Sequence, residues 1–444
     1  MNGDLTDGRI TLRLIKFALP LMIGNVLQQF YNLADTLIIG RVLGTDALAA
    51  VGSSYTLMTF LTSILIGLCM GSSAYFAIQF GKKDYEALNH SIFLSFVVIG
   101  IFTVVLNIFV FASMGWIIEV LQIPLEVQEL AEKYLACIFA GLAAVFLYNF
   151  FANVLRAVGN SVVPLIFLGI SVVLNIFLDI LFVIVFGRGV WGAAAATVLS
   201  QYVSGFGIMI YYFWKIPLLR IKKRHMRWDV TMLREIFSLS FLTCLQQSVM
   251  NFGILMVQGL VNSFGAVVMA AFAAAVKIDT IAYMPVQDFG NAFSTFVAQN
   301  YGAGKRERIR QGIRSSLIFV FFFCMLVSFL VCLFAKPLME IFIRVENIDV
   351  IQTGVGYLRV EAAFYFGIGL LFMLYGYFRA VGKPGMSVVL TICSLGTRVA
   401  LAYMLSGIPA IGVTGIWAAI PIGWIFADFV GVYHYFKMNR EDAI

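Results

Sequence analysis

Charged residues are scarce in this chain of 444 residues, where Asp, Glu, Lys and Arg together make up 12%. A typical soluble domain carries about 25% of these residues. Hydrophobic residues make up 61% of the chain. The composition therefore excludes a soluble globular protein and predicts an all-α polytopic membrane protein that lies in a lipid bilayer.

Residues that bind metals or form disulfides are also few. The six cysteines fall in or near apolar stretches without any CxxC spacing, and the three histidines form no cluster. These spacings argue against a disulfide framework and against a zinc site. The chain also lacks a nucleophile–base pair and a phosphate-binding motif. We therefore expect that the protein is not an enzyme and has no cofactor.

Long apolar runs fill most of the chain. A transmembrane helix needs about 20 mostly apolar residues. Twelve runs meet this length, over residues 15–41, 48–79, 91–118, 134–155, 162–187, 190–214, 236–262, 267–299, 313–335, 355–378, 385–407 and 412–436. The sequence thus predicts twelve transmembrane helices.

The basic residues predict the orientation of these helices. The N-terminal segment and every second loop after it carry 22 of the 30 Lys and Arg residues, whereas the opposite loops carry six. Cytoplasmic loops are enriched in Lys and Arg, so both termini should be cytoplasmic. The same bias accounts for the net charge of +7, and we expect no nucleic acid partner.

An internal repeat spaces related motifs by 221–223 residues. Arg156-Ala157-Val158-Gly159 recurs as Arg379-Ala380-Val381-Gly382, and Tyr134 recurs as Tyr357. Each repeat holds six predicted helices, so both repeats insert with the same orientation, as in parallel-repeat transporters. We predict two six-helix bundles, 1–214 and 235–444, joined by a basic cytoplasmic linker, 215–234.

Two aspartates interrupt the apolar runs, Asp35 in the first and Asp179 in the fifth. An ionised carboxylate at the membrane centre costs roughly 2.5–3.5 kcal/mol on insertion scales, and such residues usually serve function. Asn175 precedes Asp179 by one helical turn, and Thr197 follows in the sixth run. At about 1.5 Å per residue, Asp35 lies ~9 Å inside the outer end of its helix, and Asp179 and Thr197 lie ~13 Å inside. These matching depths predict one shared site.

The second repeat lacks this set of polar residues. The positions equivalent to Asp35 and Asp179 are Met256 and Ala402, so the fold itself does not require the acids. Two close carboxylates in a low-dielectric site cannot both ionise cheaply and should titrate jointly. Alternatively, oxygen atoms of the four residues hold a hard monovalent cation. A third interpretation is a hydrogen-bonded network that only locks three helices together.

The sequence does not decide the roles of Pro20 and of five further charged residues within the runs. Pro20 lies 15 residues before Asp35, and a proline inside a helix produces either a static kink or a hinge. Further charged residues interrupt the second repeat, and the sequence does not decide whether they pair structurally or act in function; they are Lys277, Asp279, Asp288, Glu361 and Arg398.

Two stretches of the chain resemble a known family. QQFYNLADT at 28–36, followed by Gly40 and Gly44, resembles the first-helix signature of the multidrug and toxic compound extrusion (MATE) family. NIFLD at 175–179, followed by a GVxGAA stretch at 189–194, is similar to its later signature. The pattern is most similar to the DinF-like prokaryotic branch, although Ile180 replaces the family's proline and the seventh run carries no acid.

The resemblance implies a fold and a set of residue roles. It implies the MATE fold of two pseudo-symmetric six-helix bundles. It places the coupling cation, H⁺ or Na⁺, at Asp35, Asn175, Asp179 and Thr197, with Pro20 as a hinge. We expect a substrate cavity that includes the polar residues Gln28, Tyr31, Asn32 and Tyr134.

The resemblance also implies an activity and a location. We expect a monomeric exporter of small-molecule drugs and organic cations in the bacterial cytoplasmic membrane, working by alternating access. The alternative is a flippase for a lipid-linked precursor. That alternative is disfavoured because the membrane interior offers only Lys277 and Arg398 as basic residues, against six acids, whereas a pyrophosphate-bearing lipid requires a basic cavity.

Overall fold

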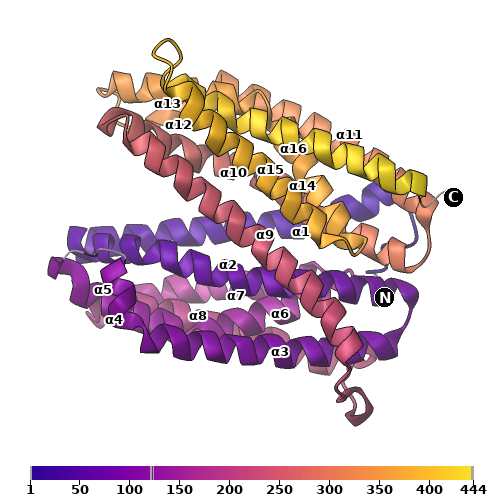
Figure 1. Cartoon of the computed structure of the whole chain (residues 1–444). Coiled ribbons are helices and arrows are strands. Elements are labelled where there is room, and N and C mark those ends of the chain that lie inside the picture. Colours follow the sequence, from indigo (N-terminus) through magenta and orange to yellow (C-terminus); the bar gives the residue numbers. More distant parts are fainter. Residues whose placement is uncertain (1–2, 121–122, 124, 442–444) are drawn as a thin grey trace. The chain divides into compact units, whose positions relative to one another are not determined.

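The computed structural model of the chain describes residues 3–120, 123 and 125–441, and every regular element within those ranges is helical (Figure 1). The first half contains α1 (Ile10–Ile38), η1 (Ile39–Leu43), α2 (Thr45–Lys82), α3 (Tyr85–Ala112), α4 (Met114–Val120), α5 (Leu125–Ala140), α6 (Leu142–Ala157), α7 (Val162–Asp179), η2 (Ile180–Val185) and α8 (Gly189–Lys215).

The second half follows after two short 3₁₀ turns, η3 (Pro217–Leu219) and η4 (Lys223–His225). It contains α9 (Val230–Asn262), α10 (Ala266–Gly302), α11 (Arg306–Leu333), α12 (Ala335–Glu340), α13 (Ile348–Ala362), α14 (Tyr365–Ala380), α15 (Pro384–Ser406) and α16 (Val413–Glu441).

The helices account for each predicted apolar run. Among the described residues, ten helical stretches are long and apolar enough to cross a membrane, and the bent pair α13–α14 adds an eleventh. The 33-residue helix α9 covers the remaining run, at 236–262. The all-α class is therefore confirmed.

The two halves of the chain repeat one packing pattern. In the first half, α2 packs against α5 and α6, and α8 packs against α6 and α7. In the second half, α10 packs against α13 and α14, and α16 packs against α14 and α15. Since α10 and α16 are the repeat equivalents of α2 and α8, each half builds its core in the same way.

The chain divides into two compact units whose bounds differ from the predicted ones. Unit 1 comprises Met1–Leu5 and Leu19–Cys244, and unit 2 comprises Thr6–Ala18 and Leu245–Ile444. The division falls inside α1 and inside α9, which are the leading helices of the two repeats. Each unit thus includes the first part of the other unit's leading helix.

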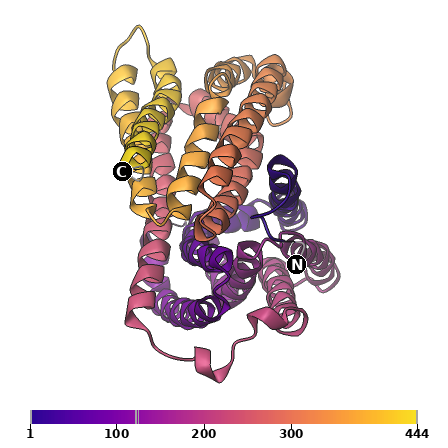
Figure 2. The same ribbon diagram turned by 90° about the vertical axis from the view of Figure 1, so that its right-hand side faces the viewer.

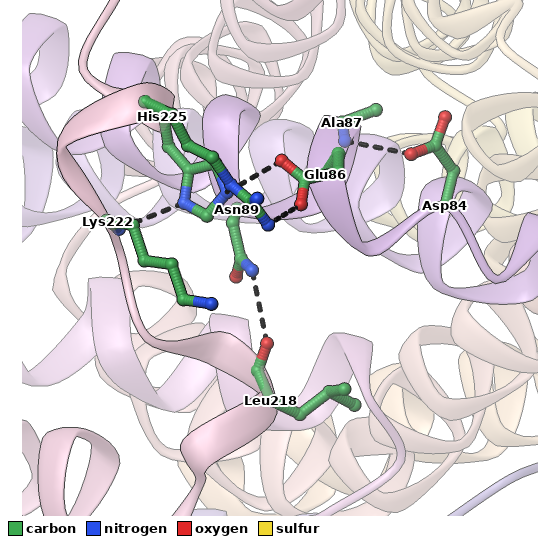
Figure 3. A network of polar contacts seen from close by, with 8 residues as sticks. Asp84, Glu86, Ala87, Asn89, Leu218, Lys222 and His225 are labelled. Carbon is green, nitrogen blue, oxygen red and sulfur yellow. Dashed lines mark hydrogen bonds and ion pairs between the residues drawn. The ribbon is translucent and has the colours of Figure 1, made fainter.

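The predicted linker 215–234 lies wholly within unit 1. Figure 2 shows residues 216–229 of it as an irregular stretch that contains the short 3₁₀ turns, whereas residues 230–234 already belong to α9. The Nδ2 of Asn89 donates to the carbonyl of Leu218 at 3.1 Å, and His225 Nε2 lies 2.9 Å from Glu86 Oε2 (Figure 3). The backbone N–H of Lys222 donates to His225 Nδ1, so the segment is held against the start of α3.

The close packing of α2 explains why the first part of α9 also belongs to unit 1. Gly71 faces the backbone of α9, where an added Cβ would lie 2.4 Å from Ser240 Cα. Ser72 and Ser240 share a 2.8 Å hydrogen bond between their hydroxyls. Small residues at such contacts let two apolar helices approach closely and pair their polar groups.

Candidate functional site

The four predicted cation-coupling residues lie on three helices of unit 1. Asp35 is on α1, Asn175 and Asp179 are in the last two turns of α7, and Thr197 is on α8. Asn175, Asp179 and Thr197 are at most 5% exposed, whereas Asp35 is half-buried. The spacing of four residues along α7 puts Asn175 and Asp179 on one face, and that face is buried.

Thr197 connects the helices through its hydroxyl. Thr197 Oγ1 accepts a 3.2 Å hydrogen bond from the Tyr31 hydroxyl of α1 and a 3.3 Å bond from Asn175 Nδ2 of α7. Both lone pairs of this oxygen are then occupied. In this arrangement Thr197 has only its own hydrogen left to offer, so it orients its neighbours rather than providing an oxygen ligand to a cation.

The carboxylate and amide oxygens of the site have no such partners. Asp35 Oδ1, Asn175 Oδ1 and both Oδ atoms of Asp179 are buried without a hydrogen-bond partner among the described residues. Leaving a buried acceptor unpaired costs about 1–3 kcal/mol, and more when it is charged. Four unpaired oxygens in one site are therefore the atoms that a proton or a small cation would satisfy.

The two carboxyls also lie close enough to affect each other. The carboxyl of Asp35 interacts electrostatically with that of Asp179, and both carboxyls interact electrostatically with the phenols of Tyr31 and Tyr134. No basic side chain of the described residues is among the groups that act on either carboxyl. Two like charges without a counter-charge are unfavourable in a low-dielectric interior, so one cation or proton at this position lowers the electrostatic energy.

A π-helical turn follows each aspartate. Asp179 directly precedes η2, and Asp35 lies four residues before η1. In η2 the backbone N–H of Phe186 donates to the carbonyl of Leu181, five residues back, at 2.9 Å. Such turns occur frequently at functional sites because they change the direction of neighbouring side chains. The sequence periodicity did not predict either turn.

Apolar side chains enclose the region next to these turns. A buried cluster draws residues from η1, α2, α5, η2 and α8: Ile39, Ala47, Tyr134, Ile138, Val183, Val190, Ala193, Ala194 and Val198. Because water is excluded there, the unpaired carboxyls interact more strongly than they would in solvent.

Comparison with known proteins decides the family. Two stretches of the chain, residues 20–181 and 239–404, each match the sequence model of the MatE family. The chain belongs to the MATE family. The double match also confirms the internal repeat.

Relatives of this MATE protein cover its whole length. It is 31% identical to the "Probable multidrug resistance protein YpnP" of Bacillus subtilis, over 99% of this chain and 98% of the relative. It is 28% identical to the "Probable multidrug resistance protein NorM" of Thermotoga maritima, over 97% and 93%.

A solved structure of a MATE protein in complex with MaL6 superposes with a TM-score of 0.94, covering 100% of this chain and 99% of that chain at 24% identity. The fold of this chain is accordingly the MATE fold of twelve transmembrane helices.

The four residues expected to line a substrate cavity of this MATE protein have different surroundings. Tyr31 is bonded to Thr197, and Tyr134 belongs to the buried apolar cluster, so both adjoin the carboxyl site. Asn32 is half-buried and Gln28 is exposed. Sequence reasoning did not connect Tyr31 with Thr197, because that contact depends on how α1 and α8 are rotated against each other.

The unpaired oxygens of Asp179 make a prediction about stability. At alkaline pH without Na⁺, Asp179→Asn should stabilise the protein by about 1–3 kcal/mol, because the amide adds hydrogen-bond donors and removes a buried charge. The thermal unfolding midpoint in detergent, followed by tryptophan fluorescence, measures the change. Asp84→Asn is the matched control, since this exposed N-cap of α3 already accepts a bond from Ala87 N. A lower midpoint for Asp179→Asn than for wild type would contradict the assignment.

Proposed function

We propose that this protein is a secondary active exporter of drugs and organic cations, driven by the inward movement of H⁺ or Na⁺. The observation that carries the proposal is the set of unpaired oxygens on Asp35, Asn175 and Asp179 in the interior of unit 1. Buried carboxyls without a partner are unfavourable unless they bind and release a positive charge during a cycle.

The names of the relatives support the class of substrate. Both full-length relatives carry names that describe multidrug resistance proteins. A carrier for varied organic cations needs negative charge that either substrate or coupling ion can neutralise. Because the Asp35–Asp179 pair has no basic counter-charge among the described residues, the two cations compete for the same electrostatic stabilisation.

Antiport follows from this competition. When the coupling cation occupies the carboxyl pair, the negative charge that favours an organic cation is neutralised, and the drug is released. When the coupling cation leaves, the charge returns and a new drug molecule binds. The difference in affinity between the two states supplies the free energy that couples the two movements.

Pro20 is proposed as the hinge for this change. Proline has no backbone N–H, so the carbonyl of Lys16 lacks its usual helical donor. The division between the two units falls between Ala18 and Leu19, and Leu19 directly precedes Pro20. A weakened turn at this place lets the Asp35 end of α1 respond to cation binding without moving the N-terminal end.

The membrane setting completes the proposal. The excess of Lys and Arg in alternate loops supports cytoplasmic termini. We place the protein in the bacterial cytoplasmic membrane, where gradients of H⁺ and Na⁺ are available, and we propose that a monomer performs transport.

Transport by purified protein in liposomes tests the function directly. An H⁺ or Na⁺ gradient, each imposed alone, should drive export of the fluorescent cation ethidium by wild type. Asp35→Asn and Asp179→Asn should each reduce that rate by about tenfold or more. Asp349→Asn, an exposed acid on the first turn of α13, should transport at the wild-type rate.

The arms of this experiment separate the outcomes. If only one gradient drives export, that ion is the coupling ion. If wild type exports no ethidium under either gradient, antiport is contradicted. Export at the wild-type rate by either Asn variant would contradict the carboxyl site.

The hinge makes its own prediction. Pro20→Ala restores a backbone donor to Lys16 and should slow ethidium export several-fold while cation binding is unchanged. Pro421→Ala is the matched control, since Pro421 also lies inside a helix, α16, but away from the division between the units. Equal slowing by both substitutions would show that Pro20 has no special role.

A further inference from the structure

The linker between the two repeats carries a dense patch of positive charge. Residues 215–234 contain seven Lys and Arg residues against one acid, Asp229. All seven basic side chains are exposed. Among the residues that the structure describes, only one of the seven forms an ion pair, Arg224 with Glu86. The other six cationic groups are therefore available to a partner of opposite charge.

The middle of the linker has a fixed backbone, and we call residues 222–228 the basic turn. The backbone N–H of Lys222 donates to His225 Nδ1 at 3.0 Å, and His225 Nε2 lies 2.9 Å from Glu86 Oε2 on α3 (Figure 3). Because Nδ1 accepts, Nε2 carries the ring hydrogen and donates it to the carboxylate. A fixed backbone presents several charges to one ligand at a lower entropy cost than a flexible loop does.

The basic turn lies on the side of α3 that exposes apolar residues. His90 Nε2 of α3 donates to the carbonyl of Arg227 at 2.8 Å. That position on α3 is 11, 14 and 18 residues before Ile101, Val104 and Ile108, and these spacings are close to whole numbers of helical turns. The three apolar side chains are 56–64% exposed. In a membrane protein such a face contacts acyl chains, so the basic turn adjoins the lipid.

The length of α3 places this contact at the level of the lipid headgroups. At about 1.5 Å per residue, the 28 residues of α3 span ~42 Å, whereas the hydrocarbon core of a bilayer is ~30 Å thick. His90 lies only ~8 Å from the start of the helix. In Figure 2 the linker runs outside the helices of unit 1. The turn therefore lies near the boundary between acyl chains and headgroups.

Exposed tryptophans accompany the charges. Trp228 ends the basic turn and is 65% exposed, and Trp214, in the last turn of α8, is 70% exposed. Lys215 Nζ lies 5.0 Å from the centroid of the Trp214 ring. Tryptophan is enriched at membrane–water interfaces because its ring is apolar and its N–H is polar. A surface that combines indoles with ammonium groups suits a lipid interface better than water alone.

We propose that the basic turn binds the phosphate headgroup of an anionic phospholipid whose acyl chains lie along the exposed face of α3. Lys222, Lys223 and Arg227 supply the positive charge, and Trp228 packs beside the lipid at the interface. A zwitterionic lipid also carries a phosphate, but its choline cation is repelled by the turn, so the site selects lipids with a net negative charge. The proposal does not depend on drug export.

Quenching of Trp228 by bromine-labelled lipid measures this binding. The purified full-length protein in neutral detergent is titrated with phosphatidylglycerol or phosphatidylcholine, each brominated in its acyl chains. The difference between each protein and its Trp228→Phe counterpart isolates the signal of this residue. Phosphatidylglycerol should quench at about tenfold lower concentration than phosphatidylcholine, because clustered Lys and Arg residues attract anionic lipids.

The double variant Lys222→Gln/Lys223→Gln should bind phosphatidylglycerol about tenfold more weakly than wild type and phosphatidylcholine equally well. The matched control is Lys437→Gln/Arg440→Gln, which removes two exposed charges from α16 and should behave as wild type. An unchanged thermal unfolding midpoint confirms that each variant is folded.

Three results would overturn the proposal. The first is equal affinity of wild type for the two lipids. The second is unchanged affinity of Lys222→Gln/Lys223→Gln for phosphatidylglycerol. The third is displacement of the lipid by inorganic phosphate at constant ionic strength, which would identify a site for soluble phosphate instead.

Discussion

The cost of an uncompensated charge in an apolar interior governs this structure. In unit 1, buried oxygens of Asp35, Asn175 and Asp179 have no hydrogen-bond partner among the described residues. A bilayer offers no water to satisfy them. A positive charge from outside the chain would stabilise these oxygens, and in the proposed antiport this stabilisation couples the binding of one cation to the release of another.

The two units meet the same constraint in different ways. Both build their cores from equivalent helices, but unit 1 carries its acids on α1 and α7, without a basic partner among the described residues. Unit 2 carries buried acids on α10 and α13, Asp279 and Glu361. The arrangement in unit 1 suits the exchanged cation of the proposed transport cycle.

Much of this architecture follows from the sequence, because hydropathy determines which segments cross a bilayer. The sequence predicts the twelve runs and the repeat. It also predicts that Asn175, Asp179 and Thr197 lie near one depth. Contacts that depend on helix rotation do not. The Tyr31–Thr197 and Tyr365–Asp279 hydrogen bonds join residues 166 and 86 positions apart, and the π turns after Asp35 and Asp179 leave no periodic pattern that separates them from an α-helix.

Release of a bound cation by drug tests the central claim most directly. Ethidium would be added to purified protein in weakly buffered solution while a pH electrode and a Na⁺-selective electrode record the release. The account predicts that wild type releases H⁺ or Na⁺ in proportion to the ethidium bound, and that Asp179→Asn binds ethidium more weakly and, compared at equal bound ethidium, releases less of either ion. Equal release from Asp179→Asn and wild type would contradict it.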